Sequence, residues 1–510
     1  MNTLDILVNA FHLVATWNSM LALFIGVFIG VLAGAIPGIS VTMAVALALP
    51  FTFVLEPIVG ILFLLGVYKG GIFGGSIPDI LIKTPGKPAS SATILDGYPM
   101  VKNGQAGKAM DMALYASCTA DVISNLSLIL FAGWLASFAM EFGPPEFFTL
   151  IVFSLTIIAG IAGDKLLHGL FAATLGLLLA TVGLDLVYGT DRFVMGNTDL
   201  MGGLNFIVVL IGLFAIPEII AYARRPSDSH MMVHSVDGDK LTFAEYKRCF
   251  RTIFRGGVIG AVLGSIPGIG AAPAAFLSYS EARRKSKNRD NFGKGEIEGV
   301  AAAESGNSGV SGATLIPLLA LGVPGDVITA IIIGAFMIHG LQPGPLLFQN
   351  NADLVYALFI GLILSSIFML FIGSFAVRVF KHIADIPKSI LLPSVLVLCV
   401  FGGYAVNNSL FDVMVMFIMG GFGYAMTRFD LPAAPFLIAF VLGPLLEDNF
   451  RQSMLMSGGS ADILFRGVIT WAFWVLTVIT IVFLIKNYIK ERRYKKELEI
   501  NMLADNGNKQ

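Results

Sequence analysis

Residues 26–39, GVFIGVLAGAIPGI, decide the fold, because the stretch returns later in the chain as residues 256–269, GGVIGAVLGSIPGI. Each copy places glycine at every fourth position and then carries a Pro-Gly pair. Proline removes a backbone donor and glycine admits unusual φ and ψ angles, so each pair is expected to interrupt a helix. Recurrence of the stretch predicts that the chain consists of two homologous halves.

A second interruption follows the first in each half. Pro78 and the Pro-Gly pair at 85–86 recur, with the same spacing, as Pro317 and the pair at 324–325. A single proline kink is commonly repaired by neighbouring membrane helices. Four Pro-Gly pairs in two matched sets instead favour discontinuous helices.

The composition is that of a membrane protein. Of the 510 residues, 56% are hydrophobic and only 13% are charged, whereas soluble proteins carry roughly 25% charged residues. The mean hydropathy is +0.81, and long apolar stretches can each span the bilayer as a helix of about 20 residues. The expected fold is an all-α polytopic membrane protein with on the order of ten to twelve transmembrane helices.

The basic residues indicate the orientation of the two halves. Lysine and arginine are enriched in cytoplasmic loops, and they flank the second copy of the repeated stretch on both sides but not the first. This difference predicts inverted repeats with re-entrant hairpins. The predicted organisation is a first membrane repeat, a basic cytoplasmic linker, a second membrane repeat and a cytoplasmic tail, with bounds 1–222, 223–255, 256–485 and 486–510.

Inverted repeats with broken helices are typical of secondary transporters, whose substrate sites lie near the bilayer midplane. A charge at that depth costs ~2.5 kcal/mol or more, so polar residues there line a cavity or form pairs. Amides that follow a Pro-Gly break suit a carboxylate, because a helix N-terminus attracts anions. The expected substrate-binding residues are Lys83, Thr84, Pro85, Gly86, Lys87, Ser90, Ser305, Asn307, Ser308, Pro324, Gly325 and Asp326.

The two lysines of this set have an alternative interpretation. Lys83 and Lys87 either contact the substrate, or reach an interface or pair with Asp79 and Asp96. Both interpretations are left open by the sequence.

The neutral polar residues of the second half have two interpretations as well. Ser305, Asn307 and Ser308 either coordinate Na⁺ or a substrate hydroxyl, or belong to glycine-serine surfaces on which helices pack closely. A Na⁺ site is expected near Pro37, Gly38, Pro267, Gly268 and Asn307.

Two other polar features have ordinary structural interpretations. Glu447 and Arg451 are four residues apart and are expected to form an ion pair on one helix face. A lone histidine such as His339 is usually hydrogen-bonded, so it is not assigned the role of a proton carrier.

Four long runs carry a family resemblance. They are GGSIPDILIKTPGKPASSATILDGYPM at 74–100, GVAAAESGNSGVSGATLIPLLALGVPG at 299–325, GAFMIHGLQPGP at 334–345 and LGPLLEDNFRQSM at 442–454. Together with the two Ile-Pro-Gly-Ile elements, they resemble the large membrane subunit (TctA-like) of the tripartite tricarboxylate transporter family. The resemblance covers nearly the whole chain.

The resemblance implies a secondary transporter of the bacterial inner membrane that is driven by an ion gradient. It also implies two protein partners: a small membrane subunit (TctB-like), and a periplasmic solute-binding protein (TctC-like) that captures an organic di- or tricarboxylate. The coupling cation is expected to be Na⁺ or H⁺, with no other cofactor, no catalytic residue and no nucleic acid. The basic tail predicts a cytoplasmic C-terminus.

The sequence departs from the family pattern at four positions. Lys83, Lys87, Ala303 and Ser308 stand where asparagine, a small polar residue, proline and asparagine are usual. The two additional cations favour a more highly charged anion as the substrate.

Two other classes of protein are alternatives. One is the permease of an ATP-driven importer. The other is an intramembrane hydrolase that uses Ser305, His339 or Asp326. The chain contains no GxxxxGK[ST] loop for a nucleotide, and no GxSxG elbow or HExxH helix supports a hydrolase.

Overall fold

The computed structural model describes residues 3–83, 89–160, 165–185, 188–224, 240–384 and 388–507. It is 81% helical, and its described residues contain one short two-stranded antiparallel sheet. The chain forms two compact units, and each unit is built from two segments that are separated in the sequence. The first unit comprises Met1–Met140 and Asn205–Tyr424, and the second comprises Glu141–Leu204 and Ala425–Gln510.

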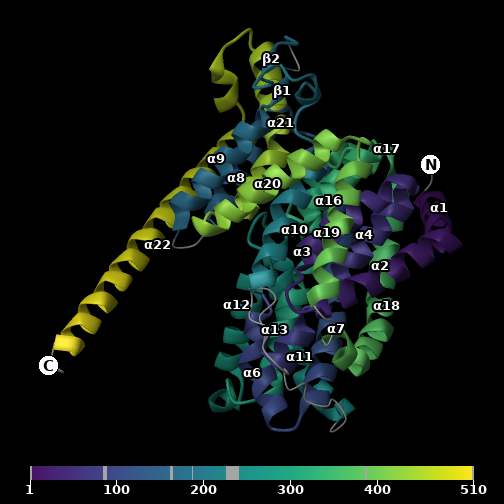
Figure 1. The fold of residues 1–510 in the computed structure, drawn as a ribbon, viewed down its shortest axis with the longest axis vertical. Helices are drawn as coiled ribbons and strands as arrows, with labels where there is room; N and C mark the ends of the chain where they lie inside the picture. Colours follow the sequence, from purple (N-terminus) through teal and green to yellow (C-terminus); the bar gives the residue numbers. More distant parts are fainter. Residues whose placement is uncertain are drawn as a thin grey trace. The chain divides into compact units, whose positions relative to one another are not determined.

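The first unit contains most of the helices (Figure 1). They are α1 (Thr3–Ala15), α2 (Trp17–Ala35), α3 (Val41–Ala48), η1 (Leu49–Val54), α4 (Pro57–Gly74), α5 (Ser76–Ile82), α6 (Ser91–Lys102), α7 (Ala106–Ala139), α10 (Phe206–Arg224), α11 (Phe243–Gly264), α12 (Ala271–Lys285), η4 (Arg289–Asn291), α13 (Ile297–Ser308), α14 (Val310–Ala313), α15 (Leu315–Leu321), α16 (Val327–Ile338), α17 (Pro345–Asn350), α18 (Ala352–Ala384), α19 (Lys388–Ala405) and α20 (Leu410–Arg428).

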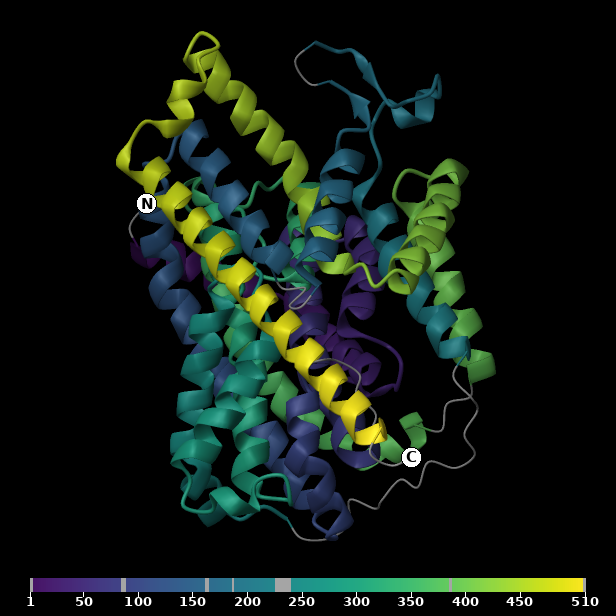
Figure 2. The ribbon, with the colours of Figure 1, turned by 90° about the vertical axis from the view of Figure 1, so that its left-hand side faces the viewer.

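The second unit is smaller. Its elements are α8 (Pro144–Gly160), α9 (Leu166–Ala180), β1 (Gly183–Leu184), β2 (Asp191–Arg192), η3 (Thr198–Leu200), α21 (Ala433–Met456), η5 (Ala461–Phe465) and α22 (Val468–Gly507). The long helix α22 packs beside α8 (Figure 2).

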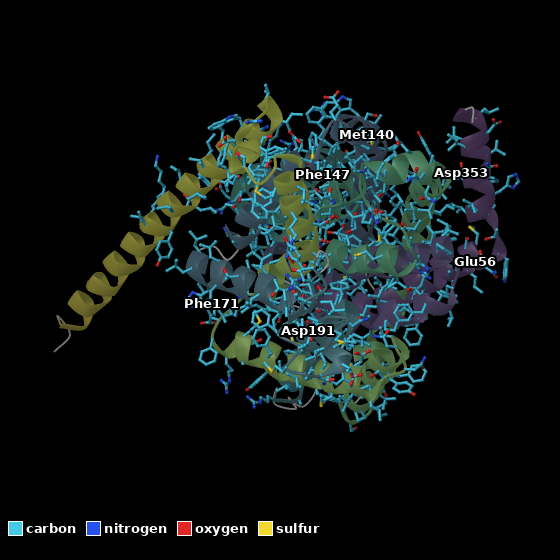
Figure 3. The ribbon with its side chains drawn as sticks, turned by 90° about the horizontal axis from the view of Figure 1, so that it is seen from above. Glu56, Met140, Phe147, Phe171, Asp191 and Asp353 are labelled. Atoms are coloured by element: carbon cyan, nitrogen blue, oxygen red, sulfur yellow. The ribbon has the colours of Figure 1, made fainter. Side chains whose placement is uncertain are left out.

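Eight helices in the described part of the chain are long and apolar enough to cross a membrane. The predicted all-α polytopic membrane protein is therefore confirmed. Six further apolar helices of the described residues have 10–17 residues, so the expected number of ten to twelve transmembrane helices stays a prediction. Many large apolar side chains are exposed, as Phe171 on α9 illustrates (Figure 3). Exposed apolar side chains are expected in a membrane protein, because they contact lipid rather than water.

The repeated glycines bring α2 and α4 into direct backbone contact. Small residues allow membrane helices to approach closely, and the glycines on the contact face the backbone of the other helix. A β-carbon on Gly66 would lie 2.7 Å from the carbonyl oxygen of Leu23. The contact, here called the glycine seam, comprises Gly26, Gly30 and Gly34 on α2 and Gly66, Gly70 and Gly74 on α4.

The second copy of the motif packs in the same way. A β-carbon on Gly260 of α11 would lie 2.7 Å from the Cα atom of Gly309, and one on Gly264 would lie 2.9 Å from the carbonyl oxygen of Val310. In both halves, therefore, the repeated glycines bring backbones into close contact: α2 with α4 in the first half, and α11 with the stretch from α13 to α14 in the second. In the second half, α11, α12 and α13 also lie side by side with one another (Figures 1 and 2).

The predicted interruptions are present at both copies of the motif. The first Pro-Gly pair separates α2 from α3, and the second separates α11 from α12. Gly38 and Gly268 have φ angles of 95° and 88°, which side chains other than glycine rarely adopt. The helices are thus discontinuous where the sequence indicated.

Arg451 organises the polar end of the second unit. It lies 2.6 Å from the Glu447 carboxylate, which confirms the predicted i, i+4 ion pair. The same guanidinium donates to Asp185, in the loop that follows β1. Arg192 of β2 in turn donates to Glu447 at 2.7 Å, so the pair belongs to a four-residue network.

The glycine seam yields a stability prediction. We expect Gly66→Ala to lower the free energy of unfolding by about 1–3 kcal/mol, because the new methyl group meets fixed backbone atoms rather than a movable side chain. Thermal unfolding of the detergent-solubilised protein measures the change. The control is Gly133→Ala in α7, where a β-carbon would have no atom within 4 Å. Equal midpoints for the two variants would show that the seam is not tightly packed.

Candidate functional site

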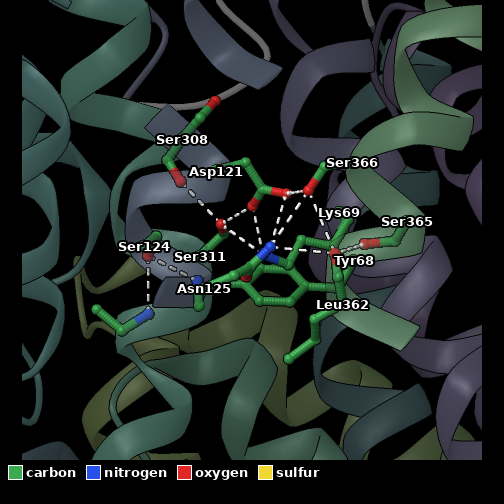
Figure 4. Close-up of polar contacts among 12 residues, drawn as sticks. Tyr68, Lys69, Asp121, Ser124, Asn125, Ser308, Ser311, Leu362, Ser365 and Ser366 are labelled. Carbon is green, nitrogen blue, oxygen red and sulfur yellow. Dashed lines mark hydrogen bonds and ion pairs between the residues drawn. The ribbon is translucent and has the colours of Figure 1, made fainter. Parts of the chain in front are cut away.

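A buried cluster of polar side chains lies where four helical elements of the first unit meet (Figure 4). We call it the lysine cluster and define it as Lys69 of α4, Asp121 and Asn125 of α7, Ser311 of α14 and Ser366 of α18. Each of these side chains is at most 3% exposed. The cluster therefore holds two charges that have no access to water.

The Lys69 ammonium is surrounded by oxygen atoms. Its Nζ atom donates to Asp121 Oδ1, to Asn125 Oδ1 at 2.7 Å and to Ser311 Oγ at 2.9 Å. An ammonium group has three N–H donors, so each donor has its own acceptor. The three acceptors differ in chemistry: a carboxylate, an amide oxygen and a hydroxyl oxygen.

The Asp121 carboxylate is held from two further sides. Ser311 donates to its Oδ1 atom and Ser366 to its Oδ2 atom. Asn125 Nδ2 donates to the carbonyl oxygen of Leu362 at 3.0 Å, which fixes the amide with its oxygen toward the lysine. Desolvating an ion pair is costly unless further hydrogen bonds satisfy the remaining atoms, and here they do.

The short helix α14 continues the helical run from α13 to α15, because Gly309 and Thr314 on either side of it keep right-handed helical backbone angles. Its backbone is also anchored to α7. Ser124 Oγ accepts from the amides of Gly312 and Ala313, both at 2.9 Å. Just before the helix, Asn307 Nδ2 and Ser308 Oγ are buried and have no hydrogen-bond partner among the described residues. Unpaired polar groups of this kind are unusual in a folded interior.

Tyr68, next to Lys69 in the sequence, connects the lysine cluster to the Pro324-Gly325 break of the second half. Its hydroxyl donates to Asp326 Oδ2 at 3.2 Å and lies 3.3 Å from Thr314 Oγ1. Asp326 is also the N-cap of α16: its Oδ1 atom accepts from the amide of Thr329 at 2.7 Å. The protein's own carboxylate thus occupies the anion-attracting start of this helix.

Both breaks of the second half meet directly. The amide of Gly268 donates to the carbonyl oxygen of Gly325 at 2.7 Å. Backbone groups freed by one Pro-Gly pair are thereby satisfied at the other, which lipid could not do. The two sequence-predicted elements at Pro267-Gly268 and Pro324-Gly325 therefore form one structural feature.

Glu304 of α13 is a second fully buried carboxylate. It accepts from Thr93 Oγ1 of α6 at 2.5 Å and from Ser117 Oγ of α7 at 2.9 Å. Ser117, Asp121 and Asn125 recur every four residues and so share one face of α7. This polar face joins Glu304 to the lysine cluster along the same helix.

Asp96 of α6 binds a loop of the second half as an anion would. Its Oδ1 atom accepts from the amides of Gly293, Gly295 and Glu296 at 2.8–2.9 Å, and its Oδ2 atom accepts from the Tyr279 hydroxyl at 2.8 Å. Successive amides that converge in this way form an anion-binding concavity. Asp96 therefore joins the two halves inside the first unit.

The comparisons with known proteins agree with this architecture. The model of the Tripartite tricarboxylate transporter TctA family matches residues 20–438. The chain belongs to this family. It is thus a multi-pass membrane protein of a transporter family, in the class of the large subunit of tripartite tricarboxylate transporters.

Two relatives of this TctA family chain come from Agrobacterium vitis. The chain is 34% identical to an uncharacterized 52.8 kDa protein in the TAR-I ttuC' 3' region, over 93% of the chain and 95% of the relative. It is 33% identical to an uncharacterized protein in the TAR-II ttuC' 3' region, over 46% of the chain and 97% of that relative. No solved structure matches the chain significantly.

The structure places the first-half site residues of this TctA family member only in part. Residues 84–88, and with them Thr84, Pro85, Gly86 and Lys87, lie outside the described residues. Lys83 is exposed, and its ammonium lies 5.7 Å from the centre of the Tyr98 ring. Ser90 is buried at the N-cap of α6.

Lys83 has an unusual backbone conformation. It follows the last turn of α5 with a φ angle of 54°, in the left-handed region that favours glycine. The spacing that relates Pro78 to Pro317 also relates Lys83 to Gly322, and Gly322 caps α15 with a φ angle of 72°. The two halves therefore end this helix in the same way.

The second-half site residues separate into two groups. Ser305 donates to the carbonyl oxygen of Ala302 in its own helix and faces Gly256 of α11, the contact that the glycine-serine packing alternative describes. Asn307 and Ser308 instead retain buried atoms without partners, and Asp326 bonds to Tyr68.

Sequence reasoning missed Lys69 and Asp121 as members of the site. The two residues are 52 positions apart, and neither lies in the repeated Pro-Gly stretches. The available signal was simple: each is an ionisable residue inside an apolar span, which marks a functional position by default.

The Asp96 contact yields a prediction for this TctA family protein. Asp96→Ala removes the acceptor of one buried and two partly buried amides, and losing the bond at the buried amide costs about 1–3 kcal/mol. We expect hydrogen–deuterium exchange at the amides of 293–296 to become roughly tenfold faster or more, since 1.4 kcal/mol corresponds to a factor of ten. Asp290→Ala is the control, because that neighbouring side chain is 93% exposed. Equal exchange in both variants would contradict the assigned contact.

Proposed function

We propose that the protein is the large permease subunit of a tripartite tricarboxylate-type uptake system in the bacterial inner membrane. It imports an organic di- or tricarboxylate that a periplasmic TctC-like binding protein delivers, together with a TctB-like small membrane subunit. A gradient of Na⁺ or H⁺ drives the import. The family match over residues 20–438 is the observation that carries this proposal.

The fold supports a transport mechanism that alternates access between the two sides. Broken helices occur in both halves, and the polar groups of the first unit lie between them. We propose that the two halves are inverted repeats and that their Pro-Gly elements enclose the substrate between them. The buried Lys69, Asp121 and Glu304 support this placement, because charges inside a membrane domain are costly and mark substrate or ion paths.

We further propose that the substrate carboxylate binds at residues 83–90, which include Lys83, Lys87 and Ser90 and are here called the lysine segment. The spacing that relates Pro85 to Pro324 makes Lys87 the sequence equivalent of Asp326 in the repeat. The start of α16 already holds the Asp326 carboxylate, whereas the equivalent position of the first half carries lysine. A negatively charged substrate is therefore attracted to the lysine segment.

Uptake by proteoliposomes tests the overall function. The permease, the small subunit and the binding protein are reconstituted, and a panel of carboxylates is supplied under separate Na⁺ and proton gradients. We expect uptake of at least one di- or tricarboxylate, abolished when the ionophore that collapses the driving gradient is added. Uptake that survives the ionophore and requires ATP would instead identify the permease of an ATP-driven importer.

Substitution of the two lysines tests whether the lysine segment binds the substrate. We expect Lys83→Gln and Lys87→Gln each to reduce uptake about tenfold or more, because a hydrogen bond between charged groups contributes about 1.5–3 kcal/mol. Lys102→Gln is the matched control. The Lys102 ammonium also lies over the Tyr98 ring, 5.1 Å from its centre, but Lys102 is not part of the lysine segment. If Lys83→Gln and Lys87→Gln both leave the transport of every anion unchanged, these lysines do not bind the substrate.

A further inference from the structure

The three acceptors of the Lys69 ammonium are oxygen atoms of kinds that can also bind a cation. The ammonium contacts one carboxylate oxygen, one amide oxygen and one hydroxyl oxygen. Hard cations bind the same three kinds of oxygen. The carbonyl oxygen of Leu362 lies one hydrogen bond further out, because it accepts from Asn125 Nδ2 at 3.0 Å.

We propose that the lysine cluster is a site for a small alkali cation, in which this cation and the Lys69 ammonium alternate as the partner of Asp121. The proposal rests on the proposed function as a cation-driven transporter and identifies the group that binds the coupling ion. Lysine suits such an exchange, because its charge sits on a flexible four-carbon stem.

The position of the cluster supports an exchange of partners. Asp121 and Asn125 belong to α7, whereas Ser311 belongs to α14. Gly309 and Thr314, on either side of α14, keep right-handed helical backbone angles, so Ser311 moves with the helical run from α13 to α15. A shift of this run relative to α7 changes the oxygen set around Asp121. Such a shift would also move the adjoining residues Asn307 and Ser308.

The unpaired atoms of Asn307 and Ser308 provide an independent observation. Both side chains are 2% exposed, and each has an atom with no hydrogen-bond partner in the described part of the chain. Such groups are energetically costly unless another state of the protein gives them a partner. They immediately precede α14, so the cation-bound state is where we place their partners.

Charge balance explains why a lysine serves this purpose. A carrier that returns without its cation would carry the bare Asp121 carboxylate through a region of low dielectric, which is costly. Lys69 neutralises the carboxylate in that state, whereas the cation does so in the loaded state. Lys69 is therefore required for the return of the unloaded carrier but not for the movement of the loaded one.

Thermal unfolding in detergent tests cation binding without transport. In Lys69→Met the carboxylate has lost its partner, and we expect NaCl to raise the unfolding midpoint by ~2 °C or more relative to choline chloride, since a ligand stabilises the state that binds it. The double variant Lys69→Met/Asp121→Asn should show no Na⁺-specific shift. Equal Na⁺ responses of the single and double variants would overturn the proposal.

Transport measurements separate the two partners of Asp121. Lys69→Met should lose net uptake about tenfold or more but retain exchange in proteoliposomes loaded with substrate and Na⁺ on both sides. A purely structural ion pair predicts that both activities fall together, and that result would overturn the proposal. The control is Lys165→Met/Asp430→Asn, which removes an exposed pair with a separation of 2.9 Å.

The double variant also covers the case in which Lys69→Met does not fold, because it removes both charges and leaves neither buried alone. Its uptake should no longer be stimulated by Na⁺, and persistent stimulation would overturn the proposal. Failure of the wild-type protein to transport any carboxylate would count against the proposed function instead. The thermal measurement would still decide whether Asp121 binds the cation.

Discussion

Lys69 and Asp121 carry opposite charges in a part of the protein that water does not reach, and the arrangement of the first unit follows from satisfying both. The ammonium requires three acceptors and the carboxylate requires donors, and these come from α7, α14 and α18 as well as α4. Removing either charge would leave the other buried alone, which is far more costly than removing both. The lysine cluster thus links helices that are distant in the sequence through hydrogen bonds to one buried ion pair.

The broken helices obey the same constraint at the level of the backbone. A Pro-Gly pair leaves amide and carbonyl groups without intrahelical partners, and hydrocarbon offers none. The structure supplies one such partner within the protein, because the amide of Gly268 donates to the carbonyl oxygen of Gly325. Amides away from the Pro-Gly pairs are also bound by side chains: Ser124 accepts from two amides of α14, and Asp96 from three amides before α13. Side chains that bind backbone amides are therefore as much a part of this fold as the apolar core.

Much of the fold could be predicted from the sequence because its signals are local or repeated. The Pro-Gly pairs predicted helix interruptions, and the i, i+4 spacing predicted the pair of Glu447 and Arg451. The number of spans is less predictable, since eight described helices are long enough to cross a membrane and six further apolar helices have only 10–17 residues.

The candidate site was less predictable, because its central contacts join residues that no local pattern relates. Nothing near Lys69 in the sequence points to Asp121, and the structure assigns Ser311 rather than Ser305 to the ammonium. A lone ionisable residue in an apolar span indicates that a partner exists but not which residue it is.

The glycine seam limits the kinds of motion that this protein can use. Where the backbones of two helices touch, ridges of side chains are missing, and rotation or sliding of one helix would drive main-chain atoms into each other. We therefore expect α2 and α4 to travel as one rigid body during any change of conformation. The hinge must then fall at chain segments free of such contact, and the glycine at position 270, with a φ angle of 71° and open space around it, meets that condition.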